Sequence, residues 1–443
     1  MMIKGLSYGY HDAAIAMFED TKCTFATSAE RITRKKNDSR PLQQWFQEPS
    51  DVTVFYEDKA NKKHRMDYYN LPYISDHHKY EHFFDHHWSH AAAGYYTRPF
   101  KEEPVCVVID AVGEWDTVSI WYEKRKVDSW RYPESLGLIY SAITQYIGLK
   151  PMEDEYITMG LAAFGEPIYD INPLLDINCQ YNLPSGIFPA NARPADLAAS
   201  VQHFIEKRIR NIMQKARMYS HHLVYSGGVA LNCVANTKIK GMFQNVHIFP
   251  NPGDAGSAFG CAAAYLDKPV DWSPYMGYDI RSNTNPKEVV DELLERSIVG
   301  VANGKAEFGP RALGNRSLLA DPRIDIKDTV NRIKRRQKYR PFAPAILSEY
   351  AEKYFKGPMN QWMQYVARAK HDYTSVSHVD GTARVQLVEP DCESVLRPIL
   401  EEWYDKTGCP ILLNTSLNIK GQPMVNDEQD AKLFESKYGV RVL

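Results

Sequence analysis

The chain has 443 residues, of which 44% are hydrophobic and 24% charged, and its formal net charge is −2. This length suits two domains of a globular protein, and the small net charge excludes a global attraction to nucleic acid or membrane. Seven cysteines without a C-x-x-C pair argue against a zinc ribbon or a disulfide framework and indicate a reducing compartment. The sequence shows neither a bilayer-length apolar run nor the apolar core of a signal peptide, so we expect a cytoplasmic protein without a membrane partner.

The chain begins with a predicted strand, a polar turn and a second strand. Residues 3–8 and 13–18 are the apolar runs, and the turn between them places His11 and Asp12 on an exposed loop. A polar cluster follows at residues 30–36, and its simplest interpretation is a solvated helix face.

Basic and aromatic side chains are interleaved between residues 56 and 96. Such a stretch could bind a nucleic-acid strand by stacking and charge. It could equally form a half-buried helical layer whose lysines and arginines face water. The residues alone leave both interpretations open.

A histidine pair lies at the end of this stretch. His86 and His90 stand four residues apart and are followed by alanines, which favour a helix. Positions i and i+4 share one helix face, so the two imidazoles can converge on one ion. A transition-metal site needs further ligands, and carboxylates elsewhere in the chain are the candidates.

Two aspartates follow predicted strands. Asp110 ends the β-branched run 105–109, which is typical of a buried central strand, and so points into the crevice where α/β folds bind ligands. Asp254 follows the strand 246–249 in a glycine-rich turn, where it could ligate a metal or cap the next helix. Taken alone, capping is the simpler interpretation of Asp254.

A third candidate site follows the predicted strand at residues 223–225. Gly227, Gly228 and Asn232 come after this strand and open a predicted helix. Glycine permits close backbone approach and a helix N-terminus attracts anions, so the arrangement can cradle a phosphate, although two glycines alone are a weak signal.

The amino-acid composition changes after Tyr265. Residues 267–274 look like a linker, so we expect domains at 1–268 and 269–443. In the second part, lysines and arginines stand next to glycine, proline and small hydroxyl or amide residues. This pattern suggests that their side chains bind phosphate or carboxylate, with arginine donating two parallel hydrogen bonds. The cations concerned are Lys305, Arg311, Arg316, Lys334, Arg335, Lys338, Arg340 and Arg384. No internal repeat is visible.

The series of motifs resembles one family, the O-carbamoyltransferases of the NodU/CmcH type, which act on nodulation factors, cephalosporins and aminoglycosides. The matching segments follow one another in the same order and cover nearly the whole chain. They are residues 11–14, 30–36, 86–92, 109–110, 159–162, 227–232, 253–256, 309–317, 340–344, 378–382 and 414–418.

The resemblance implies an α/β protein of two domains. The first would have the duplicated α/β core of actin and sugar kinases (ASKHA), similar to the metal-containing member of the tRNA threonylcarbamoylation machinery. The second would be similar to YrdC, a twisted α/β domain that makes an acyl-adenylate from ATP. The boundary at residues 268–269 fits this division.

The implied reaction consumes ATP and carbamoyl phosphate. The second domain would form carbamoyl-adenylate, and the first would transfer the carbamoyl group to a hydroxyl and release AMP. The metal would be iron(II), manganese or zinc, with iron favoured by the family, and magnesium would accompany ATP. The implied metal ligands are His86, His90, Asp110 and Asp254.

Other roles are also carried over from the family. His11 matches the general base, since an imidazole near its ordinary pKa can accept the hydroxyl proton. Gly227, Gly228 and Asn232 would hold the adenylate in the first domain. Carbamoyl phosphate and the ATP phosphates would be bound by Arg311, which is also catalytic, with Lys334, Arg340 and Arg384, assisted by Ser416 and Asn418.

Two departures bear on the acceptor. Ile157 stands where the family usually has lysine, so we expect an altered contact to nucleotide or acceptor. The chain is also shorter than typical members, and compact virus-encoded relatives carbamoylate the hydroxymethyl group of a modified cytosine. We therefore favour 5-hydroxymethylcytosine in DNA, guided by the basic and aromatic stretch 59–96, in a host cytoplasm.

Other interpretations of the function stay open. The acceptor could be a small-molecule hydroxyl on a sugar, an antibiotic or a lipo-oligosaccharide. The chain could instead be a non-catalytic nucleotide-binding regulator, or a maturation factor for a protein partner. The zinc-finger cysteines and acylphosphatase segment of such a factor are not visible, so no obligate protein partner is expected.

Overall fold

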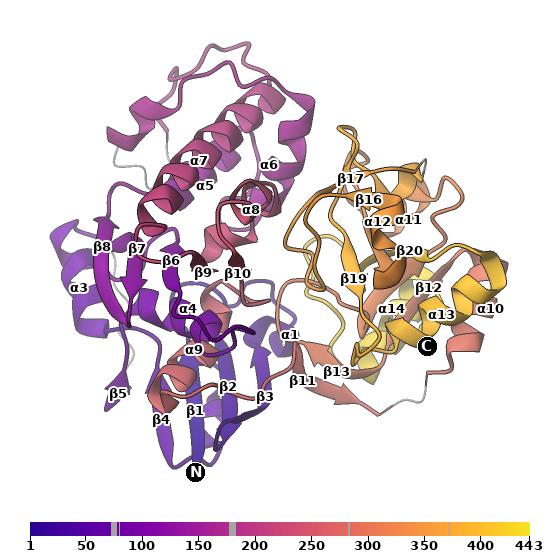
Figure 1. The fold of residues 1–443 in the computed structure, drawn as a ribbon, viewed down its shortest axis with the longest axis horizontal. Coiled ribbons are helices and arrows are strands. Elements are labelled where there is room, and N and C mark those ends of the chain that lie inside the picture. Colours follow the sequence, from indigo (N-terminus) through magenta and orange to yellow (C-terminus); the bar gives the residue numbers. More distant parts are fainter. Residues whose placement is uncertain (72–77, 79, 177–182, 282–283, 372) are drawn as a thin grey trace. The chain divides into compact units, whose positions relative to one another are not determined.

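The computed structural model describes residues 1–71, 78, 80–176, 183–281, 284–371 and 373–443. The chain forms two compact units, which are drawn in Figure 1. The first unit consists of residues 1–28 and 37–272, and the second of residues 29–36 and 273–443. The division after Trp272 lies a few residues beyond the boundary expected from composition, and the sequence pattern did not reveal that residues 29–36 belong with the second unit.

The first unit contains two five-stranded sheets. In the first sheet, β1 (Met2–Ser7) pairs antiparallel with β2 (Ala14–Glu19), which pairs antiparallel with β3 (Lys22–Ser28). On its other side β1 pairs parallel with β4 (Val52–Phe55), and β4 pairs parallel with β5 (His82–Phe83). The strand order is therefore β3-β2-β1-β4-β5.

The second sheet repeats this arrangement strand for strand. The central β6 (Val105–Ile109) pairs antiparallel with β7 (Asp116–Tyr122), and β7 pairs antiparallel with β8 (Arg125–Arg131). The parallel side consists of β9 (His222–Ser226) and β10 (Asn245–His247). This duplication is the one that defines the actin and sugar-kinase core, so the predicted fold class is confirmed.

The repeat extends to one helix of each half. α4 (His86–Tyr95) follows β5, α9 (Asp254–Leu266) follows β10, and the two helices pack against each other. Asp85 caps α4 by accepting hydrogen bonds from the backbone N–H groups of the next turn. Gly260 permits the close packing, because a Cβ atom there would lie 1.8 Å from the carbonyl oxygen of Ser89.

We expect Gly260→Ala to lower the free energy of unfolding by about 1–3 kcal/mol, because the added methyl group must push two packed helices apart. Chemical denaturation of the full chain would measure the change. Gly241→Ala is the matched control, since a Cβ atom there would meet nothing within 4 Å. Equal stability of the Gly260 variant and the unchanged protein would contradict the close approach of α4 and α9.

Additional helices enlarge the second half of this unit. Apolar side chains of β6 and β7 form one core with the amphipathic α7 (Pro194–Ala216) and with α5 (Leu136–Tyr146). Ile157 is fully buried on α6 (Glu155–Leu161), so the side chain at the position where the family usually has lysine does not reach solvent. The other α-helices of the unit are α2 (Gln43–Gln47), α3 (Lys59–Tyr68) and α8 (Cys233–Lys240).

The second unit is built on a mixed sheet of order β12-β14-β20-β15-β19. Two separate cores flank it: α10 and α13 contribute to one, and α11 and α14 to the other. The sheet strands are β12 (Ile298–Ala302), β14 (Arg316–Ala320), β15 (Ala343–Leu347), β19 (Gln386–Val388) and β20 (Ile411–Ser416). The smaller strands are β11 (Tyr275–Ile280), β13 (Gly304–Glu307), β16 (Phe355–Lys356), β17 (Ala367–Ala369) and β18 (Thr382–Ala383). The helices are α10 (Pro286–Arg296), α11 (Lys327–Ile333), α12 (Ala351–Tyr354), α13 (Leu396–Thr407) and α14 (Glu428–Tyr438).

The polar cluster at residues 30–36 begins on α1 (Ala29–Thr33), and two of its arginines are not solvated. Arg31 is 3% exposed and donates hydrogen bonds to the carbonyl groups of Glu307 and Gly309. Arg34 donates to the carbonyl group of Pro423 and forms an ion pair with Asp430 at 3.1 Å. The interpretation as a solvated face is wrong for these two, because carbonyl groups distant in sequence satisfy their guanidinium groups.

Among the helices of the described residues, none combines the length and the apolar character needed to cross a membrane.

Candidate metal centre

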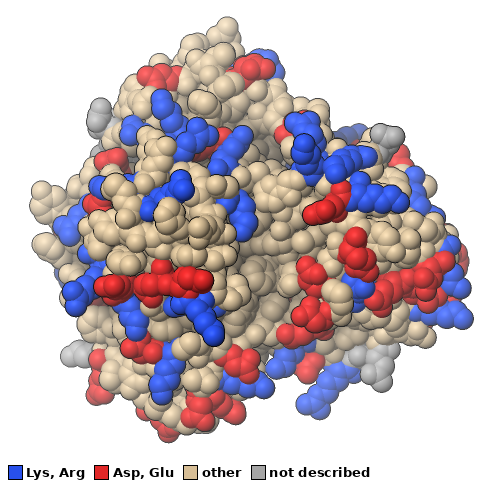
Figure 2. Space-filling model, in the orientation of Figure 1, with Lys and Arg blue, Asp and Glu red and all other residues tan. Residues whose placement is uncertain are grey.

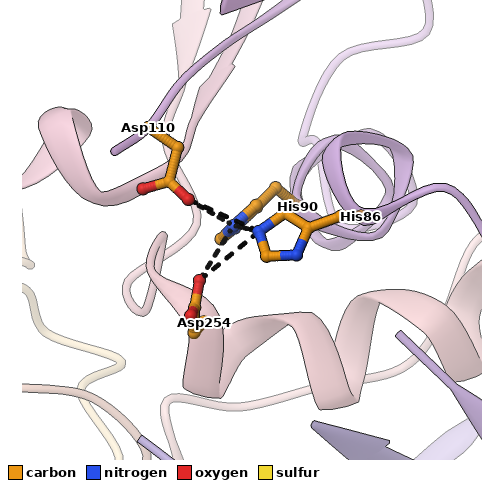
Figure 3. Close-up of side chains that lie close together, drawn as sticks. All are labelled: His86, His90, Asp110 and Asp254. Atoms are coloured by element: carbon orange, nitrogen blue, oxygen red, sulfur yellow. Dashed lines mark hydrogen bonds and ion pairs between the residues drawn. The ribbon is translucent and has the colours of Figure 1, made fainter. Parts of the chain in front are cut away.

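Four side chains from three elements converge within the first unit (Figure 3). His86 and His90 come from α4, Asp110 follows β6, and Asp254 is the first residue of α9. One donor atom of each lies within 4.8 Å of the donor atoms of the others. The structure thus brings together all four residues that the sequence analysis assigned to a metal.

The donor atoms point toward a common centre. The Nε2 atoms of the two histidines are 3.1 Å apart, as the i and i+4 spacing on one helix allows. The Oδ2 atom of Asp110 lies 3.4 Å from each of these nitrogens. The Oδ1 atom of Asp254 lies 3.6 Å from His86 Nε2 and 3.2 Å from His90 Nε2. All four residues are buried, so water screens these charges little.

The cluster is electrostatically suited to a cation. Burial alone would lower the pKa of His86, but the carboxylates of Asp110 and Glu57 raise it to about 10. Burial would raise the pKa of Asp110, but the two histidines hold it well below its usual range. Positive charge between these groups is supplied either by protons on the imidazoles or by a divalent ion bound to their Nε2 lone pairs.

The surrounding contacts orient the donors. His90 Nδ1 lies 3.0 Å from the carbonyl oxygen of Pro252 and 3.1 Å from Ser257 Oγ, so it can donate there while Nε2 faces the centre. Asp110 Oδ1 accepts a hydrogen bond from the backbone N–H of Gly228 at 3.0 Å, which leaves Oδ2 for the histidines. Two imidazole nitrogens and two carboxylate oxygens fit a divalent transition ion such as iron, manganese or zinc.

Asp254 is not a helix cap. α9 begins at Asp254 itself, so Gly253 occupies the cap position, and no side chain makes a capping bond there. The carboxylate faces His86 and His90 instead (Figure 3). The capping interpretation, which was simpler on sequence alone, is therefore wrong, because the helix starts earlier than the pattern suggested.

His11 lies in the turn between β1 and β2, and both of its ring nitrogens have partners. Nδ1 lies 2.8 Å from Asp12 Oδ2, and Nε2 lies 2.7 Å from the carbonyl oxygen of Met152. Burial alone would lower the pKa of His11, but the charges of Asp12 and Asp254 raise it to about 10. Both partners are hydrogen-bond acceptors, so a protonated ring would donate at both nitrogens. It must lose a proton before it can act as the predicted base.

The glycine pair at the end of β9 is explained by the approach of β6. Val108 stands opposite Ser226 in the parallel register, so Asp110 and the glycines reach the same edge. Gly227 has a φ of +92°, and a Cβ atom there would lie 2.3 Å from the carbonyl oxygen of Ile109. Asn232 caps α8, and its side-chain amide also bonds to Gln202. Their binding of an adenylate stays a prediction.

In the second unit, Lys334 meets two other predicted residues. Its Nζ atom lies 2.9 Å from both the carbonyl oxygen and Oδ1 of Asn418, and 3.2 Å from Ser416 Oγ. Burial, together with the charges of Arg336 and Arg340, lowers the pKa of Lys334 well below its ordinary value. The Nζ atom already has oxygens of Ser416 and Asn418 as partners, so phosphate binding by this cluster stays a prediction.

Two further predicted arginines lie in the same unit. Arg311 is on a loop organised by Glu307, whose Oε1 atom accepts hydrogen bonds from the backbone N–H groups of Leu313, Asn315 and Arg316. Arg384 follows β18, and its buried Nε atom has no hydrogen-bond partner among the described residues. Phosphate binding by these arginines stays a prediction.

Comparison with known proteins identifies the family. The family model described as Carbamoyltransferase N-terminus matches residues 69–182 and 176–263, and the model described as Carbamoyltransferase C-terminus matches residues 290–443. The chain belongs to the carbamoyltransferase family.

Named relatives agree with this assignment. Nodulation protein NolO of Bradyrhizobium diazoefficiens is 31% identical over 78% of this chain and 75% of its own length. The 3'-hydroxymethylcephem-O-carbamoyltransferase of Amycolatopsis lactamdurans is 30% identical over 70% of this chain and 67% of its own length. An uncharacterized protein of Synechocystis is 30% identical over 97% of this chain and 93% of its own length.

Among solved structures, an activator of a 2-hydroxyisocaproyl-CoA dehydratase from Clostridium difficile aligns with 60% of this chain and 95% of its own, with a TM-score of 0.39 and 12% identity.

The sequence analysis missed a buried carboxylate of this carbamoyltransferase that contacts one of the proposed metal ligands. Glu57 lies two residues after the end of β4, with Tyr56 between them, which is similar to the signal that singled out Asp110 after β6. It is 3% exposed, and its carboxylate contacts Lys62 and His86. An acidic residue after an apolar run was visible in the sequence. It lies in the basic and aromatic stretch, for which nucleic-acid binding was one of the two interpretations.

Several cations of that stretch are not available to a ligand, although Lys63 and His64 are exposed. Lys62 and Arg65 are buried, and Lys59 lies over the rings of Phe55 and Tyr80. His77 and Lys79, which belong to the same stretch, lie outside the described residues. The carbamoyltransferase therefore uses several of these cations for packing and charge pairing, which neither interpretation from sequence anticipated.

Proposed function

We propose that the chain is an ATP- and carbamoyl-phosphate-dependent O-carbamoyltransferase. The second unit would activate the carbamoyl group as carbamoyl-adenylate, and the first would transfer it to an acceptor hydroxyl. The observation that carries the proposal is the convergence of His86, His90, Asp110 and Asp254 in a member of this family. The contacts of Lys334 with Asn418, two residues predicted to bind phosphate, support the activation step.

The division into two steps follows from the chemistry of carbamate, which is a poor electrophile. In the first step, water hydrolyses carbamoyl phosphate to carbamate and inorganic phosphate, and a carbamate oxygen then attacks the α-phosphorus of ATP, from which pyrophosphate leaves. In the second, the acceptor oxygen attacks the carbonyl carbon, AMP leaves, and the hydroxyl proton passes to a base. A bound divalent ion would supply Lewis-acid polarisation of an oxygen in the transfer step.

The protein's own residues would bind and orient the reactants. Lys334 with Ser416 and Asn418 would bind a phosphate of ATP or carbamoyl phosphate, aided by Arg311, Arg340 and Arg384. Gly228 would keep Asp110 in the orientation that serves the metal. His11, once neutral, would accept the hydroxyl proton.

For the acceptor we propose a small-molecule hydroxyl. The name of the Amycolatopsis relative specifies a hydroxymethyl group on a cephem, and other named relatives are nodulation proteins. A hydroxymethyl group is also what 5-hydroxymethylcytosine in DNA would present, so that acceptor remains the second candidate. Against it, Lys62 and Arg65 are buried, and on the face shown in Figure 2 each unit carries both acidic and basic side chains.

The test is to incubate the full chain with ATP, carbamoyl phosphate and iron(II). One reaction contains pooled sugars, aminoglycosides and hydroxymethyl cephems, and the other contains duplex DNA with 5-hydroxymethylcytosine. We expect mass spectrometry to find a carbamoyl addition in the first reaction, with AMP formed only when carbamoyl phosphate is present. No AMP formation in metal-replete protein would refute the enzyme and favour the regulator.

The salt dependence of carbamoyl transfer distinguishes the two candidate acceptors. Transfer to DNA should fall steeply between about 50 and about 200 mM salt, because phosphate contacts release counterions. Transfer to a neutral small molecule should change little over that range. Carbamoylation of DNA alone, with this salt dependence, would replace the small-molecule acceptor by DNA.

A further inference from the structure

We propose that Glu57 is a positioning residue of the metal centre. Its carboxylate would accept a hydrogen bond from His86 Nδ1 and so direct the Nε2 lone pair of that ring toward the ion, while Lys62 holds the carboxylate in place. The inference rests on the metal centre of the proposed function and adds to it a residue outside the four ligands.

The contacts of Glu57 divide its two oxygens between two partners. Oε1 lies 2.7 Å from Lys62 Nζ, and Oε2 lies 3.6 Å from His86 Nδ1. Lys62 stands in the first turn of α3, directly after the connection that carries Glu57, so the backbone presents the two side chains to each other. The exposed fractions are 3% for Glu57, 7% for Lys62 and 2% for His86. These groups meet where water cannot easily replace either partner.

A histidine that ligates a metal through Nε2 carries its proton on Nδ1. In His86 the Nδ1 atom is buried and makes no hydrogen bond within the described part of the chain. An unpaired buried N–H group is costly, so its acceptor should be the carboxylate that already lies beside it. The 3.6 Å separation is slightly longer than a hydrogen bond, and a small adjustment of either side chain closes it.

The two histidines are therefore supported differently. His90 Nδ1 faces neutral acceptors, the carbonyl oxygen of Pro252 and the hydroxyl of Ser257. His86 Nδ1 faces a carboxylate, which makes an imidazole a stronger ligand than a carbonyl group does. We infer that His86 is the stronger nitrogen donor of the pair and that Glu57 is the reason.

The carboxylates around the centre suit a divalent ion. Asp110 and Asp254 lie beside the two imidazoles, Glu57 lies beside that of His86, and Lys62 pairs with Glu57. Glu57 without Lys62 would leave an uncompensated buried charge, which explains why the cation is buried beside it.

The test measures metal affinity rather than turnover. Full-length protein is freed of metal with a chelator and titrated with Co(II) in competition with a chromophoric chelator. We expect Glu57→Gln to weaken Co(II) binding about 10- to 100-fold and to shift the visible absorption bands of bound Co(II), because one nitrogen donor becomes weaker. Glu57→Gln/Lys62→Met removes both charges together, so it gives the same loss of affinity without leaving an unpaired buried lysine.

Glu292→Gln is the matched control. Glu292 is also a buried carboxylate, 4% exposed, and it pairs with Arg296 and Arg441 in the second unit. This variant should leave Co(II) affinity and absorption unchanged. Circular dichroism and thermal unfolding would verify the fold of each variant.

The outcomes distinguish a failure of the proposed role of Glu57 from a failure of the proposed metal centre. If the unchanged protein binds no Co(II), the metal centre and the role of Glu57 both fail. If it binds Co(II) and the folded Glu57 variants bind it equally well with the same absorption bands, the role of Glu57 alone is overturned. A loss shared by the Glu292 control would show a general effect of removing a buried charge and would also overturn it.

Discussion

Asp110→Asn should abolish metal binding by the first unit and slow carbamoyl transfer on the order of 10³-fold, since a Lewis acid contributes several kcal/mol to the transition state. The asparagine oxygen can still accept the hydrogen bond from Gly228, so the substitution removes charge rather than shape. Metal content after reconstitution and the rate of carbamoyl addition would measure the two losses. Formation of carbamoyl-adenylate should persist, because the proposal assigns that step to the second unit.

Asp321→Asn is the control for this experiment. Asp321 is a buried aspartate at the end of β14, and its carboxylate pairs with Arg323 in the second unit. Its replacement should leave metal content unchanged. Full metal occupancy in the Asp110 variant would contradict the assignment of Asp110 as a ligand.

Lys334→Met should slow the activation step and leave the metal centre intact. We expect formation of carbamoyl-adenylate to fall about 10²- to 10³-fold, which is the usual cost of removing one charge-stabilising donor. Metal binding should not change. Methionine fills similar space but leaves oxygens of Ser416 and Asn418 without their donor, so thermal unfolding must verify the fold of the variant.

Release of pyrophosphate from ATP in the presence of carbamoyl phosphate would report the activation step. Lys327→Met serves as the control, because Lys327 is only partly buried at the start of α11. Added carbamoyl-adenylate should restore transfer by the Lys334 variant to the unchanged rate. A variant that still releases pyrophosphate at the normal rate would exclude Lys334 from the activation site.

The sequence predicted the parts of the site that depend on local spacing. His86 and His90 share a helix face because four residues make about one turn, and Asp110 had to lie at a sheet edge because it ends a buried strand. The resemblance to the family added the duplicated fold. The strand order then showed the duplication, although no repeat is visible in the sequence, because an α/β sheet requires a hydrophobic pattern rather than particular residues.

Long-range pairings could not be predicted in the same way. The partners of Arg31 are backbone carbonyl groups in the second unit, and no side-chain pattern marks a carbonyl as an acceptor. Lys62 looks like a surface lysine until Glu57 is placed beside it. The start of α9 decided the orientation of Asp254, and helix boundaries are among the features that a sequence pattern determines least well.

The repeated architecture of the first unit also bears on how its site is assembled. Both imidazoles come from α4 of the first repeat, and both carboxylates come from the second repeat, one after β6 and one at the start of α9. A protein made of a single repeat would hold two histidines or two aspartates, and neither pair is the complete set. The centre therefore requires both repeats, and it depends on the two carrying different residues at these positions.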